Sequence, residues 1–263
     1  MRWGAEDIWQ SVVLQLPGFT VEVLPEVDSS NSELMRRAHA GLAEPVLLVA
    51  EQQSAGRGRL GRRWHGVRFD TLTFSLGLPL APQDWSGLSL AVGLSLAQSL
   101  HPEISLKWPN DLWWNSSKLA GILIETANLT GPESREATTR YVVIGVGINL
   151  RTPPSTAFFT KAVGLEVLQP GREASQVLLS VMAPLVSAVL AFEQEGFAPL
   201  QAAFNARDAL SEQVVTLSDG SHGLAQGVDQ RGALRVHTAQ GLRVIDSAEV
   251  SVRPREPLAA ALS

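Results

Sequence analysis

A short basic segment carries the residues best suited to chemistry in this sequence. Between positions 57 and 63 stand four arginines and no acidic residue, although the whole chain has a formal net charge of −5. These are Arg57, Arg59, Arg62 and Arg63. Guanidinium groups bind phosphates and carboxylates through paired hydrogen bonds, and the glycines at 56, 58 and 61 let the backbone close on a ligand. The segment predicts a mobile anion-binding loop, with a solvated surface turn as the alternative.

The same segment satisfies the pattern G-x-G-x-x-G, which also occurs in dinucleotide-binding sites. In those sites the glycines open a helix whose N-terminus receives the pyrophosphate. Here Arg62, Arg63 and Trp64 follow the last glycine, and a strand-like run resumes at 71–78. Because no helix is predicted after Gly61, a dinucleotide-dependent oxidoreductase is the weakest of the functions that we consider.

A second group of reactive residues lies at 107–111, which reads Lys-Trp-Pro-Asn-Asp. The proline stiffens the backbone, and the Asn-Asp pair favours a turn that directs side chains to one side. Lys118 follows at the start of an apolar run, in which Gly121 indicates the close approach of another group. The alternatives are a solvated strand end for Lys118 and a core position for Trp108.

Two glycines alternate near the end of a third apolar run, at 140–149. Gly145 and Gly147 fall on the same face of a strand and leave room there for a flat ligand. Asn149 follows with a side chain that offers both a donor and an acceptor to the edge of a base. Close packing of a sheet against a helix is the alternative explanation for the glycines.

These motifs must be positioned by a mixture of strands and helices. Apolar and alternating runs predict strands at 21–24, 45–52, 71–78, 118–125 and 140–149. Apolar residues at helical spacing predict helices at 84–100, 175–192 and 197–210. Ser30 or Asn31 could cap a further helix that runs to about His39. Residues 151–172, with three prolines, form an irregular connection.

After residue 212 the pattern changes to short runs separated by turn signals. Four or five short strands in so few residues predict a small barrel rather than an extension of the main sheet. We therefore expect a ligand-binding catalytic domain at 1–211 and a small β-barrel domain at 212–263.

Composition excludes several other classes of protein. The chain has no cysteine, and its five histidines show no ligand spacing, so we predict neither disulfides nor a metal site built by the protein. The net charge of −5 and the lack of a basic recognition module argue against a nucleic-acid-binding repressor. The N-terminus does not resemble a signal peptide, and no uninterrupted apolar run approaches about 18 residues. We expect a cytoplasmic protein that binds neither nucleic acid nor membrane.

Taken in order, the motifs strongly resemble the biotin protein ligases. The matching segments are Asp28-Ser29-Ser30-Asn31, Gln53, Gly56–Trp64, Lys107–Asp111, Lys118–Glu125 and Gly145–Asn149. Each motif alone is ambiguous, but together in this order they are highly specific, and the resemblance covers roughly 25–255. It implies an α+β fold: a mixed sheet with helices, similar to class II aminoacyl-tRNA synthetases, followed by an SH3-like barrel.

The resemblance also implies roles for individual residues. Biotin is expected to contact Ser29, Ser30, Asn31, Gln53, Arg57, Gly58, Arg59, Lys118 and Gly121. ATP and the adenylate are expected to contact Arg57, Arg59, Arg62, Trp64, Asn110 and Asn149. Lys118, Arg59 and Asp111 are the candidate catalytic residues. Lys118 corresponds to the family's invariant lysine between the biotin carboxylate and the α-phosphate, and Asp111 is a candidate to position the incoming amine.

The implied activity is the ATP-dependent activation of biotin, with Mg²⁺ carried by the phosphates. Biotin would then pass to a lysine of a biotin carboxyl carrier protein, such as that of acetyl-CoA carboxylase, with the ligase acting as a monomer or homodimer. A lipoate-protein ligase is the nearest alternative. The sequence departs from the family at Ser30, usually threonine, and at Gly66 and Thr71, where serine and asparagine are typical. It matches the short form without an N-terminal DNA-binding domain.

Overall fold

The structure is a computed structural model that describes residues 3–129, 139–154, 161–246 and 253–254. A seven-stranded mixed sheet has the order β1-β2-β3-β7-β6-β5-β4, with β1 parallel to β2 and the other pairs antiparallel. Its strands are β1 (Thr20–Leu24), β2 (Val46–Ala50), β3 (Thr71–Leu80), β4 (Ser105–Lys107), β5 (Asp111–Trp114), β6 (Ser117–Asn128) and β7 (Arg140–Asn149). The helices are α1 (Ala5–Val12), α2 (Ser30–His39), α3 (Leu88–Leu100), α4 (Ala174–Glu195) and α5 (Gln201–Asn205).

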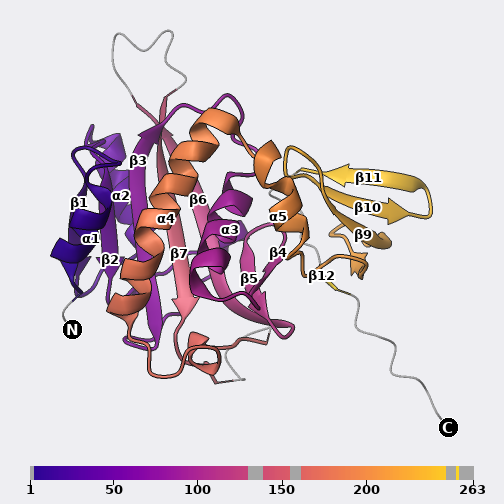
Figure 1. The fold of residues 1–263 in the computed structure, drawn as a ribbon, viewed down its shortest axis with the longest axis horizontal. Helices are drawn as coiled ribbons and strands as arrows, with labels where there is room; N and C mark the ends of the chain where they lie inside the picture. The colour runs from indigo at the N-terminus through magenta and orange to yellow at the C-terminus, as the bar shows by residue number, and fades with distance from the viewer. Residues whose placement is uncertain (1–2, 130–138, 155–160, 247–252, 255–263) are drawn as a thin grey trace.

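Alternating apolar residues let the sheet bury both of its faces. Leu47 and Val49 of β2 belong to the large core formed with α1, α3 and α4, whereas Val46 and Leu48 belong to a smaller core beneath α2. Figure 1 shows α4 crossing the sheet on the first of these faces. The opposite face, beside α2, is therefore the one that can hold a ligand over the glycines of β7.

A second sheet is formed by the C-terminal part of the chain, in the order β11-β10-β9-β8-β12. Its antiparallel strands are β8 (Val214–Thr216), β9 (His222–Val228), β10 (Leu234–Thr238), β11 (Gly241–Ile245) and β12 (Arg253–Pro254). It projects from one side of the larger sheet (Figure 1). A mixed sheet with helices followed by a small antiparallel β-sheet confirms the predicted α+β class.

Helix α4 bears on the expectation that the protein does not bind a membrane, because it is long and apolar. It is long and apolar enough to cross a bilayer by length and average hydropathy, with a mean hydropathy of 1.9 over its best window. It nevertheless packs on α1, α3 and β3 and buries Val177, Val181, Leu185, Val189 and Phe192, the face predicted from their spacing. In this fold α4 is the central core helix.

Two predicted helices are shorter than expected, and one hairpin was not predicted. The helix predicted from residue 84 begins only at Leu88, because Gly87 adopts a left-handed conformation with φ of 85°. The helix predicted for 197–210 consists of a 3-10 turn and the short helix α5, which ends at Asn205. Beyond it, the backbone of residues 207–209 hydrogen-bonds instead to Leu106 of β4. The β4–β5 hairpin is thus hydrogen-bonded through β4 to the segment that follows α5.

The connection between the two sheets contains a buried acidic group. Asp208 pairs with Leu106 of β4, and its Oδ1 accepts a hydrogen bond from the backbone N–H of Leu210 at 2.9 Å. Its buried Oδ2 has no hydrogen-bond partner among the described residues. Burial raises the pKa of the Asp208 carboxyl from 3.8 to about 6. The folded state therefore binds this proton more tightly than the unfolded state.

We predict that Asp208→Asn stabilises the protein, and more so at pH 8 than at pH 5. A raised carboxyl pKa costs nothing below about 4, and its destabilising effect is complete only above about 6, where it reaches roughly 1–3 kcal/mol. Urea unfolding of the wild type and the variant at both pH values measures the difference. An equal gain at the two pH values would contradict the assignment to ionisation.

Candidate functional site

Strand register brings the separate motifs into one row across the ligand-binding face. Lys107 pairs with Asp111, Asp111 with Gly121, Gly121 with Gly147, and Gly147 with Thr73. Paired residues on neighbouring strands point to the same side of a sheet. The row therefore runs over β4, β5, β6, β7 and β3, and it places two charged side chains next to two glycines.

The strip above the glycines is occupied by this chain's own side chains. A Cβ on Gly147 would lie 2.3 Å from the Trp64 indole, and one on Gly145 would lie 2.1 Å from the Asn31 side-chain oxygen. The glycines of β7 thus make room for Trp64 and Asn31, and the interpretation that they leave open space for a ligand is wrong in this structure. The indole Nε1 of Trp64 is buried without a hydrogen-bond partner among the described residues, which leaves a donor at this position.

Positive charge gathers around a single carboxylate at one end of the row. Lys118 Nζ lies 2.6 Å from Asp111 Oδ1 and 5.9 Å from the centre of the Trp64 ring. The guanidinium of Arg59 donates to Asn110 Oδ1 at 3.1 Å, and Asn110 Nδ2 donates to the backbone oxygen of Ile122 at 2.7 Å. The turn of the Lys-Trp-Pro-Asn-Asp motif therefore holds the second arginine of the loop beside the lysine of β6.

The pKa values of Lys107 and Arg59 are lowered by burial and by the cations near them. Burial lowers the pKa of Lys107 and of Arg59, and the Asp111 carboxylate opposes that shift in both. Arg62 lowers both pKa values further, and Lys118 also lowers that of Lys107. Lys118, Lys107 and Arg59 therefore lie near the Asp111 carboxylate, and Arg62 lies near Lys107 and Arg59. This excess of positive charge suits a bound anion with more than one negative charge.

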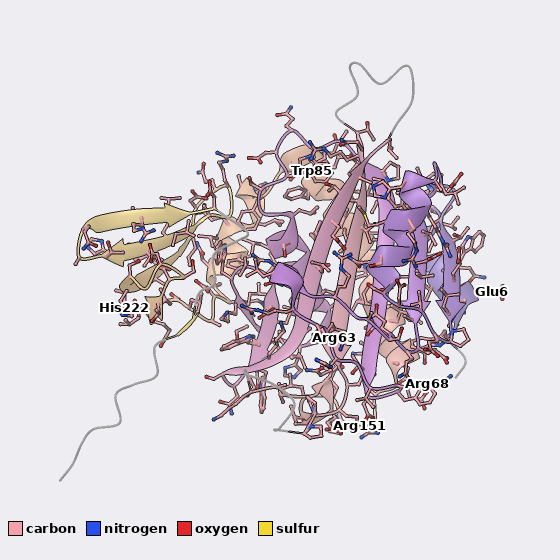
Figure 2. The ribbon with its side chains drawn as sticks, turned by 180° about the vertical axis from the view of Figure 1, so that it is seen from behind. Glu6, Arg63, Arg68, Trp85, Arg151 and His222 are labelled. Atoms are coloured by element: carbon pink, nitrogen blue, oxygen red, sulfur yellow. The ribbon has the colours of Figure 1, made fainter. Side chains whose placement is uncertain are left out.

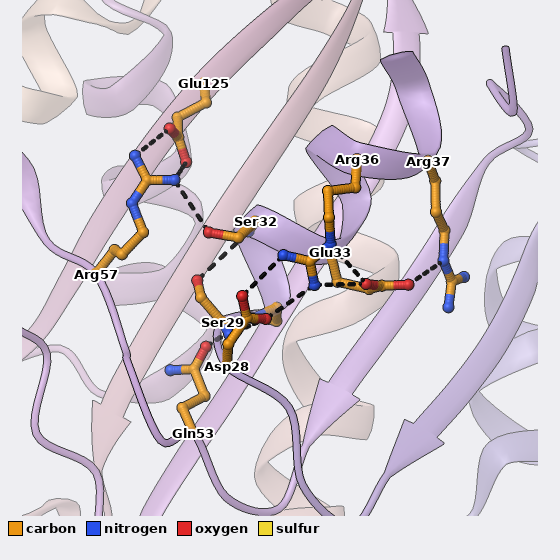
Figure 3. Close-up of polar contacts among 10 residues, drawn as sticks. Asp28, Ser29, Ser32, Glu33, Arg36, Arg37, Gln53, Arg57 and Glu125 are labelled. Carbon is orange, nitrogen blue, oxygen red and sulfur yellow. Dashed lines mark hydrogen bonds and ion pairs between the residues drawn. The ribbon is translucent and has the colours of Figure 1, made fainter. Parts of the chain in front are cut away.

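Arg57 points to a different partner from the other loop arginines. Its Nη2 lies 2.8 Å from Glu125 Oε1, and its Nη1 donates to Ser32 Oγ at 3.1 Å (Figure 3). The second oxygen of Glu125 accepts from Asn31 Nδ2 at 3.0 Å. We had not predicted a role for Glu125. The sequence did offer a signal, because Glu125 ends an apolar run and lies on the same side of β6 as Gly121.

The Asp-Ser-Ser-Asn segment forms the polar end of the row. Ser29 caps α2 by accepting from the backbone N–H of residue 32, and Gln53 Oε1 accepts from the Ser30 N–H at 2.7 Å. Ser75 Oγ of β3 lies at hydrogen-bond distance, 2.7 Å, from both Ser30 Oγ and Asn31 Oδ1. Three of the predicted biotin contacts, Ser29, Ser30 and Asn31, are buried. Ser75 was missed because nothing marks a serine inside an apolar strand as part of a site.

A network of ion pairs around Arg36 holds the Asp28–Asn31 segment in place. Arg36 forms two hydrogen bonds with Asp28, of 2.8 and 2.9 Å, and also pairs with Glu33 (Figure 3). The Arg36 guanidinium holds the pKa of Asp28 down to about 2. Asp28 therefore stays ionised at physiological pH, and its Oδ1 accepts from the N–H of Ser29.

The remaining predicted residues have structural contacts as well. Asn149 is buried and its Nδ2 donates to the backbone oxygen of Lys118 at 3.4 Å, which ties the end of β7 to the start of β6. The N–H of Gly58 donates to the carbonyl oxygen of Arg62 and closes the arginine loop into a turn. Figure 2, seen from behind, labels Arg63 over the strands of the larger sheet. The loop thus lies over the face that carries the row.

A groove of about 740 Å³ lies beside the arginine loop. The start of α3, residues of β6, and Asp229 with residues 231–233 of the β9–β10 turn complete its walls. Trp108 is buried at its base and donates from Nε1 to the carbonyl oxygen of Gly232 at 3.1 Å. Trp108 therefore takes the core position that we kept as its alternative, and it connects the two sheets.

We predict that ligand binding protects the loop at 56–68 from trypsin. The contacts of the loop include Arg57 with Glu125, Arg59 with Asn110 and Arg68 with Glu51, and an anion among its charges would add others. The measurement is the cleavage rate after the loop arginines, without ligand and with biotin and ATP together. Equal rates in the two states would contradict ligand-dependent closure.

Comparison with known proteins identifies the chain's relatives. A family model described as "Biotin/lipoate A/B protein ligase family" matches residues 24–149, and one described as "Biotin protein ligase C terminal domain" matches residues 212–253. The chain is 32% identical to the biotin–[acetyl-CoA-carboxylase] ligase of Paracoccus denitrificans, over 87% of this chain and 98% of that protein. The chain belongs to the biotin protein ligase family.

Two further relatives support membership of the biotin protein ligases. The bifunctional ligase/repressor BirA of Escherichia coli is 32% identical over 94% of this chain and 78% of that protein. The structure of the Aquifex aeolicus biotin protein ligase in complex with biotin and ATP is similar, with a TM-score of 0.73 and 27% identity. That match covers 89% of this chain and 99% of the other. Family membership excludes the dinucleotide-dependent oxidoreductase.

Proposed function

We infer that this chain is a biotin protein ligase that activates biotin with ATP and transfers it to a lysine of a carrier protein. The observation that carries this conclusion is the group of four cations, Lys107, Lys118, Arg59 and Arg62, that lies beside Asp111 at one end of the row. Activation brings the carboxylate of biotin against the phosphates of ATP, and such a reaction needs concentrated positive charge. Family membership identifies which carboxylate is activated.

In the first step a carboxylate oxygen of biotin attacks the α-phosphorus of ATP. A new O–P bond forms while the bond to the β-phosphate breaks, which gives biotinyl-5′-AMP and pyrophosphate. We propose that Lys118 lies between the carboxylate and the α-phosphate, and that Arg59 and Arg62 bind the phosphates. Trp64 offers its indole face and a free N–H donor beside them. The loop that closes over the product protects the anhydride from water.

In the second step the acceptor lysine attacks the carbonyl carbon of the adenylate. The amide C–N bond forms, the C–O bond breaks, and AMP leaves with the electron pair. The amine loses a proton to solvent, and we propose that Asp111, which lies beside Lys118, orients the amine. We propose that the carrier's lysine enters through the groove between the arginine loop and the C-terminal sheet.

The charges of ATP also require a counterion. Among the described residues no group of three or more His, Cys, Asp and Glu side chains could hold a metal ion. The donors near the row are cationic, so they fit phosphate oxygens rather than a metal. We propose that Mg²⁺ arrives on the phosphates of ATP, where it neutralises part of their charge.

One experiment separates biotin from lipoate as the substrate. The protein is incubated with ATP and either acid, and exchange of labelled pyrophosphate into ATP is followed. We expect exchange with biotin alone, and biotin on the lysine of an added biotin carboxyl carrier domain. Exchange with lipoate alone would favour the lipoate-protein ligase, which the first family description also includes.

We further propose that the protein acts in the cytoplasm and does not bind duplex DNA specifically. The support is the net charge of −5 together with the contacts of Arg57 with Glu125 and of Arg59 with Asn110, which hold these arginines against the larger sheet. A gel-shift experiment with and without biotin and ATP is the measurement. Non-specific binding should disappear as salt rises. A shift that persists in high salt and depends on sequence would contradict the proposal.

A further inference from the structure

Lys107 is a cation of the row that has no role in either proposed step. Its register partner is Asp111, so the two side chains lie on the same face of neighbouring strands. Its Nζ lies over the Trp113 ring, 5.2 Å from the centre. Within the part of the chain that the structure describes, Lys107 Nζ makes no hydrogen bond or salt bridge, whereas Asp111 is bound by Lys118 at 2.6 Å.

The contact between Lys118 and Asp111 conflicts with the proposed chemistry. The ammonium of Lys118 donates to a carboxylate of the protein, Asp111, at 2.6 Å. To lie between the biotin carboxylate and the α-phosphate, that ammonium must turn away from Asp111. Asp111 is only 16% exposed, so its charge would be poorly solvated once Lys118 left. Another cation has to take its place.

The charged groups that face Lys107 make it the suitable replacement. They are Asp111 from β5, Lys118 from β6, and Arg59 and Arg62 from the loop. Arg59 is directed to Asn110, and under the proposed function both arginines bind phosphates when ATP is present. A lysine side chain has a flexible four-carbon stem, so its ammonium can move from the Trp113 ring to a neighbouring carboxylate.

We propose that Lys107 is a positioning residue that takes Asp111 as its ion-pair partner when substrate binds and thereby frees Lys118 to bind the substrate anion. This inference rests on the proposed ligase function. Lys107 itself contacts no reacting atom, and it acts only by changing which cation holds Asp111. The competing explanation is that Lys107 merely stabilises the hairpin by its contact with Trp113.

A double-mutant cycle tests the exchange. The rate of biotinyl-adenylate formation is measured in single turnovers for the wild type, Lys107→Met, Asp111→Asn and the double variant. We expect Lys107→Met to slow the wild type about tenfold, because Lys118 stays bound to Asp111. In the Asp111→Asn background, where no carboxylate holds Lys118, the same change should have almost no effect. Lys107→Arg should keep most of the rate.

The controls separate the possible failures. Lys161→Met removes an exposed lysine and should leave the rate unchanged. If Lys107→Met does not fold, as judged by urea unfolding, the cycle is run with Lys107→Gln. Equal slowing in both backgrounds, or no slowing in either, would overturn the proposal. A wild type that makes no adenylate from biotin would instead overturn the proposed function.

Discussion

Replacing Lys118 with glutamine is expected to lower the rate of biotinyl-adenylate formation by roughly 10²- to 10³-fold. Glutamine keeps much of the length of lysine but removes its charge. That charge matters most in the first step, because negative charge is redistributed there between the biotin carboxylate and the α-phosphate. The substitution also removes the ion-pair partner of Asp111, whose Oδ1 lies 2.6 Å from Lys118 Nζ. Both effects act on the same anionic step.

Pyrophosphate release in a single turnover measures the first step for Lys118→Gln. Transfer from biotinyl-adenylate supplied directly should be reduced less, since the two anions are already joined. Lys118→Arg should restore only part of the rate, because a guanidinium is wider and directs its donors differently. Lys161→Gln is the matched control. If Lys118→Gln makes adenylate at the normal rate, Lys118 is only a lysine at the end of a strand.

Gly147→Ala is expected to slow adenylation by roughly 10- to 100-fold. An alanine Cβ would lie 2.3 Å from the Trp64 ring, a distance that real Cβ contacts do not show, so the indole must leave β7. Displacement of Trp64 also moves it away from Lys118, whose Nζ now lies 5.9 Å from the ring centre. We expect a higher KM for ATP together with a lower kcat, because both binding and positioning depend on this ring.

A matched substitution separates the loss of the site from the loss of stability. In Gly77→Ala the new Cβ would lie 2.2 Å from the hydroxyl of Tyr141, on the same sheet but away from the cations. Both variants should be less stable by about 1–3 kcal/mol in urea unfolding. Only Gly147→Ala should change the kinetic constants of the folded protein. Trp64→Ala added to Gly147→Ala should restore stability and leave adenylation slow, and recovery of the rate would contradict our assignment of Trp64.

The sequence alone predicted the features that depend on residues close together in the chain, namely secondary structure and local motifs. Alternation and helical spacing predicted α2, α4, β3, β6 and β7 to within a few residues, since these patterns reflect which side of an element is buried. The change of pattern after residue 212 predicted a small β-barrel of short strands, and the structure has short antiparallel strands there, in a sheet of their own. The arginine loop and the Lys-Trp-Pro-Asn-Asp turn were recognisable as parts of an anion site because their charges are close together in the chain.

Only the tertiary structure decided how these parts meet. The row from Lys107 through Asp111 and Gly121 to Gly147 exists because of strand register, which no single segment encodes. The pairing of Arg57 with Glu125 likewise joins a loop to a strand 68 residues away. The helix predicted for 197–210 is cut short because the backbone around Asp208 pairs with β4. Contacts between distant segments override local preference wherever burial and hydrogen bonding stabilise them more than one further turn of helix would.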